Sequence, residues 1–174
     1  DLWTGSVPTK ALVASARTAH AVRHAARFGI GAAPPTIDLP TVWRRVREVQ
    51  EAIASTDDHP DRYAAMGLEI VTGDATLTGP NEVTVDGCDG AGGAGGGRRV
   101  LQTRFVLLCT GSRAVVPDVP GLADVEVLTD ETLFVLERPP SSAIVLGGGP
   151  MGVELAQAFI RLGMATTIVQ DGPS

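Results

Sequence analysis

The chain has 174 residues, of which 44% are hydrophobic and 20% are charged, and its formal net charge is −6. This length is enough for one large domain, or for parts of two, with a buried core. No apolar run approaches the roughly 20 residues that span a bilayer, and the acidic balance argues against nucleic acid as a partner. We therefore expect a cytoplasmic protein that handles small ligands, with neither a membrane nor a nucleic acid as partner.

Two helices are predicted in the first third of the chain. Residues 7–27 place Ala, Leu and Val at helical spacing, and residues 41–55 resume this spacing after a break rich in Pro and Gly. The second helix has an apolar stripe of Val42, Val46, Val49 and Ile53. His20 and His24 lie four residues apart on the first helix and could hold a metal, but no third ligand is evident. We interpret them as a solvated face and expect no metal site.

The pattern changes to that of strands after Gly67. Three are expected, at Leu68–Val71, at Asn81–Val85 and within residues 98–109, where the apolar stretch Phe105–Leu108 ends the third. The glycine-rich residues 86–99 predict a flexible tip between two antiparallel strands.

Three polar residues of this region are interpreted as structural. His59 stands in a turn before a short helix and is expected to be a cap or a surface residue. The two cysteines of the chain, Cys88 and Cys109, have a spacing that indicates neither a disulfide framework nor a metal knuckle.

The last third of the chain alternates strand, turn and helix. A buried strand at Ala143–Leu146 is followed by a glycine turn, a helix to about Leu162, Gly163 as its stop, and a second strand at Ala165–Val169. This order predicts the first βαβ part of a Rossmann unit.

The turn after the first of these strands reads G-G-G-P-M-G and fits the pattern G-x-G-x-x-G. Gly147 would permit the tight turn, Gly149 would let a pyrophosphate approach the backbone, and Gly152 would let helix and strand pack closely. We predict that these three glycines bind a dinucleotide; a purely structural turn is the alternative.

The adenosine ribose of such a ligand would meet a residue about 20 positions further along. Gln170 stands at the end of the strand but carries no charge, and Asp171 is displaced by one residue. No Lys or Arg follows Arg161 to bind a 2′-phosphate, so NAD is favoured over NADP.

The segment C-T-G-S-R-A-V-V-P-D-V-P-G-L, residues 109–122, precedes G-x-G-x-x-G-x-E. This order resembles the flavin-dependent pyridine nucleotide-disulfide oxidoreductases, such as mercuric reductase and dihydrolipoamide dehydrogenase, over essentially the whole chain. The resemblance implies an α/β fold: a partial FAD-binding domain of helices, antiparallel strands and part of a parallel sheet (1–122), a linker (123–140) and a partial NAD(P)-binding Rossmann domain (141–174). It also implies that Thr110 and Gly111 lie against FAD. We interpret the chain as an internal fragment of a homodimer whose dimerisation domain lies outside it.

In that family the helix beside the flavin begins C-x-x-x-x-C-V-P-S-K, and its two cysteines form a redox-active disulfide. Here D-L-W-T-G-S-V-P-T-K places Ser6 at the flavin-proximal cysteine and Asp1 at the distal one. A serine hydroxyl forms neither a disulfide nor a thiolate, so this alignment excludes disulfide reduction by this route.

The resemblance assigns further roles on the same helix. Thr9 and Lys10 correspond to the S-K of the family motif, and the resemblance implies that Lys10 pairs with Glu154 beside the flavin, where it would stabilise the reduced form. A solvated lysine and an ordinary helix glutamate are the alternatives.

These assignments predict a parent enzyme that passes hydride from NADH through FAD to a small-molecule, non-disulfide acceptor. A quinone or another nicotinamide would serve, and the soluble transhydrogenases of the family offer a precedent. The alternatives are a disulfide, mercuric or dihydrolipoamide reductase with misplaced or substituted cysteines, and a non-catalytic nucleotide-binding homologue. The isolated piece is expected to be inactive.

Overall fold

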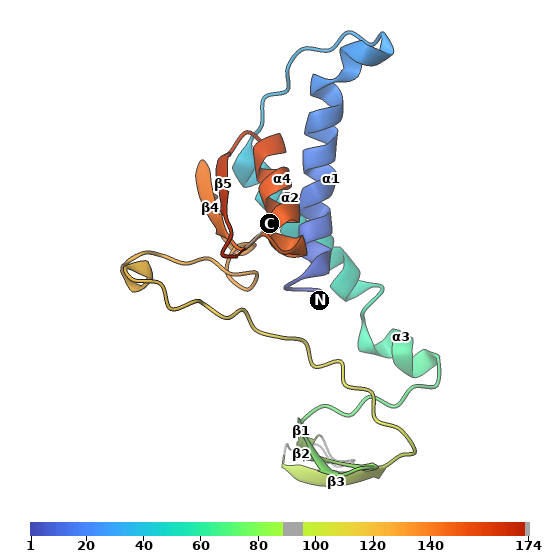
Figure 1. The fold of residues 1–174 in the computed structure, drawn as a ribbon. Coiled ribbons are helices and arrows are strands. Elements are labelled where there is room, and N and C mark those ends of the chain that lie inside the picture. Colours follow the sequence, from blue (N-terminus) through green and yellow to red (C-terminus); the bar gives the residue numbers. More distant parts are fainter. Residues whose placement is uncertain (89–95, 173–174) are drawn as a thin grey trace. The chain divides into compact units, whose positions relative to one another are not determined.

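The computed structural model describes residues 1–88 and 96–172, and Figure 1 shows its elements. The chain divides into two compact units. The first unit combines Asp1–Ser55 with Arg113–Ser174, and the second unit is Thr56–Ser112. The domain limits expected at residues 122 and 140 stay a prediction. Residues 89–95 of the glycine-rich tip expected at residues 86–99 lie outside the described residues.

Three helices form the centre of the first unit. They are α1 (Ser6–Arg23), α2 (Leu39–Ser55) and α4 (Pro150–Arg161), and α1 packs against both of the others (Figure 1). Small residues on α1 let the helices approach closely. The shared core includes Leu12, Ala16, Trp43, Val46, Phe134, Phe159 and Leu162.

The first helix ends earlier than its apolar pattern, residues 7–27, predicts. The α-helical part ends at Arg23, and the 3₁₀ turn η1 (Ala25–Phe28) follows it. Gly29 closes this turn in the left-handed conformation. Tightening from α to 3₁₀ is common where the last carbonyls of a helix need partners.

The side chains of α2 hold the segment that leads to the last third of the chain. The indole of buried Trp43 donates from Nε1 to the carbonyl of Leu133 at 2.9 Å and stacks on Phe159, with ring centroids 6.2 Å apart. Arg47 donates to the carbonyl of Leu136 at 3.0 Å. Because buried carbonyls are costly without a donor, these bonds fix the segment on the helix.

The strand, helix and strand predicted near the end of the chain are confirmed, but the prediction that the strands are buried is wrong, because Ile144 and Ile168 are exposed. β4 (Ser142–Leu146) and β5 (Ala165–Val169) pair in parallel, and α4 connects them. Leu146 lies opposite Val169, so the two strands end side by side.

The second unit contains α3 (Pro60–Ala65) and an antiparallel sheet in the order β1-β2-β3, whereas the three-residue turn η2 (Leu122–Asp124) belongs to the first unit. The strands are β1 (Asp74–Gly79), β2 (Glu82–Cys88) and β3 (Gly97–Gln102). Cys88 lies opposite Gly97, so the antiparallel pairing predicted around the glycine-rich tip is confirmed.

Two strand predictions in this unit are wrong. Leu68–Val71 and Phe105–Leu108 have no regular secondary structure, and the side chains of Phe105, Leu107 and Leu108 are exposed. β1 begins at Asp74, where its pairing with β2 begins. The pairing does not extend back to Leu68–Val71, so this apolar segment has no described partner strand. An apolar run becomes a strand only where a neighbour takes up its backbone hydrogen bonds, and no described strand lies beside Phe105–Leu108.

Candidate functional site

The glycine turn after β4 has the geometry that its sequence predicted. Gly147 has a φ of 106°, which favours glycine, and its N–H donates to Val169 at 2.8 Å. Gly149 is the N-cap of α4, and a Cβ there would meet nothing within 4 Å. A Cβ on Gly152 would lie 2.2 Å from the Gly147 carbonyl, so only glycine lets this helix approach the turn. The open N-terminus of α4 fits a phosphate-bearing ligand.

Gln170 lies beside this turn, directly after β5. Its Oε1 accepts a hydrogen bond from the N–H of Gly148, and its Nε2 donates to the backbone carbonyl of Asp171. Both ends of the side-chain amide are therefore used within the protein. The roles of Gln170 and Asp171 toward a ribose stay predictions.

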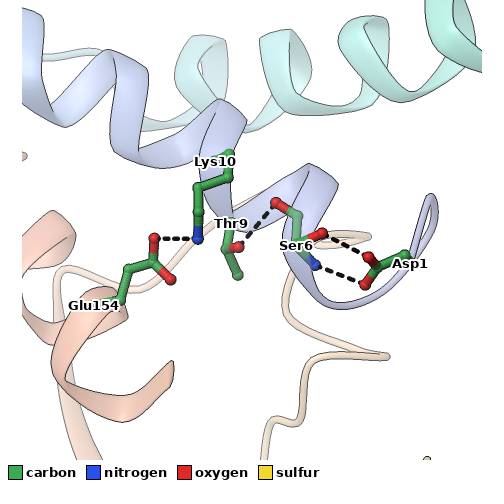
Figure 2. Close-up of polar contacts among 5 residues, drawn as sticks. All are labelled: Asp1, Ser6, Thr9, Lys10 and Glu154. Atoms are coloured by element: carbon green, nitrogen blue, oxygen red, sulfur yellow. Dashed lines mark hydrogen bonds and ion pairs between the residues drawn. The ribbon is translucent and has the colours of Figure 1, made fainter. Parts of the chain in front are cut away.

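An ion pair joins the two helices that carry the predicted catalytic residues. The Nζ of Lys10 on α1 lies 2.5 Å from Oε1 of Glu154 on α4, although the residues are 144 positions apart (Figure 2). The Lys10 side chain is 62% exposed and that of Glu154 is 29% exposed. A pair this exposed contributes little to stability, at most about 1 kcal/mol.

The turn that precedes α1 brings Asp1 and Ser6 together. Ser6 Oγ donates to Asp1 Oδ2 at 2.7 Å, and the Ser6 N–H donates to Oδ1 at 3.2 Å (Figure 2). The carboxylate thus caps the first N–H of the helix, which its N-cap residue, Gly5, cannot do with a side chain. Buried Thr9 donates from Oγ1 to the Ser6 carbonyl at 3.0 Å.

These residues form one group on the first unit. Ser6 and Lys10 are four positions apart on α1 and therefore lie on the same side of the helix. Thr110 and Gly111, predicted to contact FAD, belong to the second unit, where both are exposed in a segment without regular secondary structure. Their role stays a prediction.

The histidines have structural surroundings. The rings of His20 and His24 lie 4.0 Å apart, and His24 Nδ1 is 2.8 Å from the carbonyl of His20. His59 caps α3 by accepting from the N–H of Asp61, as its position predicted. In residues 1–88 and 96–172 no three His, Cys, Asp or Glu side chains gather as metal ligands.

Charge surrounds His20 at the end of α1. Partial burial, followed by the nearby cations His24, Arg161, Arg27 and Arg23, lowers the pKa of His20 below its usual value of 6.5. Both causes act in the same direction, because each disfavours a second positive charge at this place.

Comparison with known proteins decides the family. The model of the family described as "Pyridine nucleotide-disulphide oxidoreductase" matches residues 2–174, nearly the whole chain. The chain belongs to this family. The membership confirms the resemblance and the partial FAD-binding and Rossmann-like α/β fold that the sequence implied.

Several members of the pyridine nucleotide-disulphide oxidoreductases are similar to the chain. A mercuric reductase of Streptomyces lividans is 35% identical over 94% of this chain and 33% of its own length. A dihydrolipoyl dehydrogenase of Chlorobaculum tepidum is 32% identical over 95% of this chain and 34% of its own. The chain thus spans about one third of these relatives.

Solved structures of the same family share the fold. LpdA of Mycobacterium tuberculosis matches with a TM-score of 0.69 at 24% identity, over 97% of this chain and 36% of its own. The HOCl-induced flavoprotein disulfide reductase RclA of Escherichia coli matches with a TM-score of 0.68 at 24% identity, over 96% of this chain and 32% of its own. Among the described residues, no helix is both long and apolar enough to cross a membrane.

One residue near the site was not expected. Gln50 on α2 is only 3% exposed, and its Nε2 donates to the carbonyls of Leu2 and Trp3 at 2.9 and 3.0 Å. The sequence did hold a signal, because Gln50 follows Val46 by one helical turn and so is a lone polar residue on the buried face. The apolar stripe alone did not reveal it.

Proposed function

We propose that the complete protein is a flavin-dependent NAD(P)H oxidoreductase whose electron acceptor is not a disulfide. The observation that carries this proposal is the contact between Asp1 and Ser6. The resemblance predicts that these residues correspond to the family's cysteine pair, and their side chains touch one another as a disulfide pair would, yet neither contains sulfur. Oxygen side chains cannot take part in thiol-disulfide exchange.

The residues of the chain are suited to hold both cofactors. Gly147, Gly149 and the N-terminus of α4 would hold the phosphates of the nicotinamide cofactor, and NAD is favoured because residues 162–174 contain no Lys or Arg for a 2′-phosphate. Lys10, held by Glu154, would place a positive charge beside FAD.

The overall reaction balances for a quinone acceptor. Bound FAD supplies two-electron chemistry, so that NADH + H⁺ + quinone gives NAD⁺ + hydroquinone. Among the chain's own groups, Glu154 orients the Lys10 ammonium, and the Asp1–Ser6 pair would present a hydroxyl and a carboxylate to the acceptor in place of thiols. Another nicotinamide is a second possible acceptor.

Anaerobic titration of the complete protein with NADH tests the proposal. We expect the flavin absorbance to bleach without a long-wavelength thiolate-to-flavin band, and 1,4-benzoquinone to restore it. A thiolate band together with reduction of lipoamide, glutathione disulfide or Hg²⁺ would contradict the proposal and favour the activities in the relatives' names. Cofactor binding without bleaching would indicate a non-catalytic homologue.

A further inference from the structure

The turn that carries Asp1 has no regular secondary structure to hold it. Residues 1–5 precede α1, and the Trp3 side chain is 58% exposed. Within the turn and the first helical residues, the Val7 N–H donates to the Asp1 carbonyl at 3.3 Å. Additional contacts help to define where the Asp1 carboxylate lies, because ordering the backbone of an irregular segment costs conformational entropy.

Gln50 supplies these contacts from α2. Its side chain lies in the core beside buried Trp43 and Val46, and it gives both of its N–H groups to two successive carbonyls, those of Leu2 and Trp3. A primary amide has two such donors, so this arrangement uses its full donor capacity. Because the buried Gln50 side chain is already ordered, its hydrogen bonds hold the two carbonyls in place.

We propose that Gln50 is a positioning residue that fixes the Asp1–Ser6 pair for reaction with the electron acceptor. It touches neither of these side chains and acts through the backbone of Leu2 and Trp3. This inference rests on the proposed function, in which the Asp1–Ser6 side receives the acceptor while Lys10 and Glu154 serve hydride delivery to the flavin. Gln50 should therefore affect the reoxidation of the flavin by the acceptor and not the reduction of the flavin by NADH.

Two rates measured separately on the complete holoenzyme distinguish this role from a structural one: the reduction of the flavin by NADH and its reoxidation by the acceptor. Gln50→Glu replaces the donating nitrogen by an oxygen that faces two carbonyl oxygens, whereas Gln50→Asn keeps the donor on a shorter side chain. We expect Gln50→Glu to slow flavin reoxidation by 1,4-benzoquinone roughly ten- to a hundredfold, with Gln50→Asn intermediate. Flavin bleaching by NADH should stay within about twofold in both variants, because Lys10 and Glu154 are untouched.

Arg45→Met is the matched control. Arg45 also lies on α2 and donates to a carbonyl of α1, that of Ala11, at 3.1 Å, but it does not contact the turn. Both half-reactions should be unchanged in this variant. A parallel fall of both half-reactions in the Gln50 variants, or an unchanged reoxidation rate, would overturn the inference; if Gln50→Glu does not fold, Gln50→Asn decides in the same way.

A second measurement keeps this inference distinct from the proposed function. If 1,4-benzoquinone fails to reoxidise the unaltered protein, the proposed acceptor class is wrong, whatever Gln50 does. The indole NMR signal of Trp3 then reports the turn directly. It should move in Gln50→Glu and stay in place in Arg45→Met, and an unmoved signal in Gln50→Glu would show that Gln50 does not hold the turn.

Discussion

The hydroxyl of Ser6 donates to the carboxylate of Asp1 at 2.7 Å, across a turn of five residues. The two side chains therefore meet in the turn that we predict to correspond to the cysteine pair of the family motif. The same contact caps the first N–H of α1, so Asp1 has a structural reason to be there as well.

Cysteines introduced at positions 1 and 6 test whether this turn corresponds to the cysteine pair of the family motif. Because the side chains at positions 1 and 6 touch, we expect the double variant Asp1→Cys with Ser6→Cys to form a disulfide within the complete protein. It should gain a long-wavelength absorbance band on reduction and NADH-dependent disulfide reduction. Thiol titration before and after reduction measures the bond, and each single variant is the control; a double variant whose thiols stay free would contradict the alignment.

Lys10→Met should slow flavin reduction by NADH by at least about tenfold, because it removes a positive charge that would stabilise the reduced flavin. The free energy of unfolding should change by no more than about 1 kcal/mol, since the Lys10 side chain of the ion pair is mostly exposed. Stopped-flow bleaching and chemical denaturation measure the two effects. A large loss of stability without a change in the rate would assign the pair to structure alone.

Two glycines of the turn should respond differently to alanine. In Gly152→Ala the new Cβ meets the Gly147 carbonyl at 2.2 Å, so helix and turn must separate at a cost of about 1–3 kcal/mol or more. Gly149→Ala meets nothing within 4 Å and should fold as stably as the unaltered protein, while its affinity for NADH falls because the methyl group occupies the approach of the phosphates. Thermal unfolding and NADH titration separate the two, and unaltered affinity in Gly149→Ala would argue against a dinucleotide at this turn.

Gln170→Glu tests the choice of nicotinamide cofactor. A carboxylate after β5 would accept hydrogen bonds from ribose hydroxyls and repel a 2′-phosphate, so the ratio of kcat/KM for NADH to that for NADPH should rise roughly tenfold. The amide of Gln170 also accepts from the Gly148 N–H, which a carboxylate can still do. An unchanged ratio would place the ribose elsewhere.

The lowered pKa of His20 predicts a pH dependence of stability. Between its folded pKa and 6.5 the unfolded chain binds more protons at this residue than the folded chain, so the folded state loses stability as the pH falls through this window. His24→Gln removes one of the neighbouring charges and should raise the pKa of His20. Histidine NMR titration measures this shift, and a pKa of His20 at or above 6.5 in the unaltered protein would contradict the prediction.

Local pattern was sufficient to predict the helices, the parallel pair β4 and β5, and the hairpin around the glycine-rich tip. It failed at Leu68–Val71 and Phe105–Leu108, because an apolar run shows that a segment tends to be extended or buried but not whether a partner strand is present. The contact of Lys10 with Glu154 came from the family motif and not from spacing, since 144 residues separate them. Gln50 was missed because its place on the buried face of α2 was overlooked beside the apolar stripe, and because its partners, the carbonyls of Leu2 and Trp3, cannot be read from side-chain pattern.

The bonds from Trp43 and Arg47 to the carbonyls of Leu133 and Leu136 have a mechanical consequence. The peptide that leads into β4 is attached to α2, and α4 is packed on α1, so the glycine turn and the start of α1 belong to the same compact unit. Hydrogen exchange should accordingly protect α1, α2 and α4 together, and nicotinamide binding should leave the spacing of Lys10 and Glu154 unchanged.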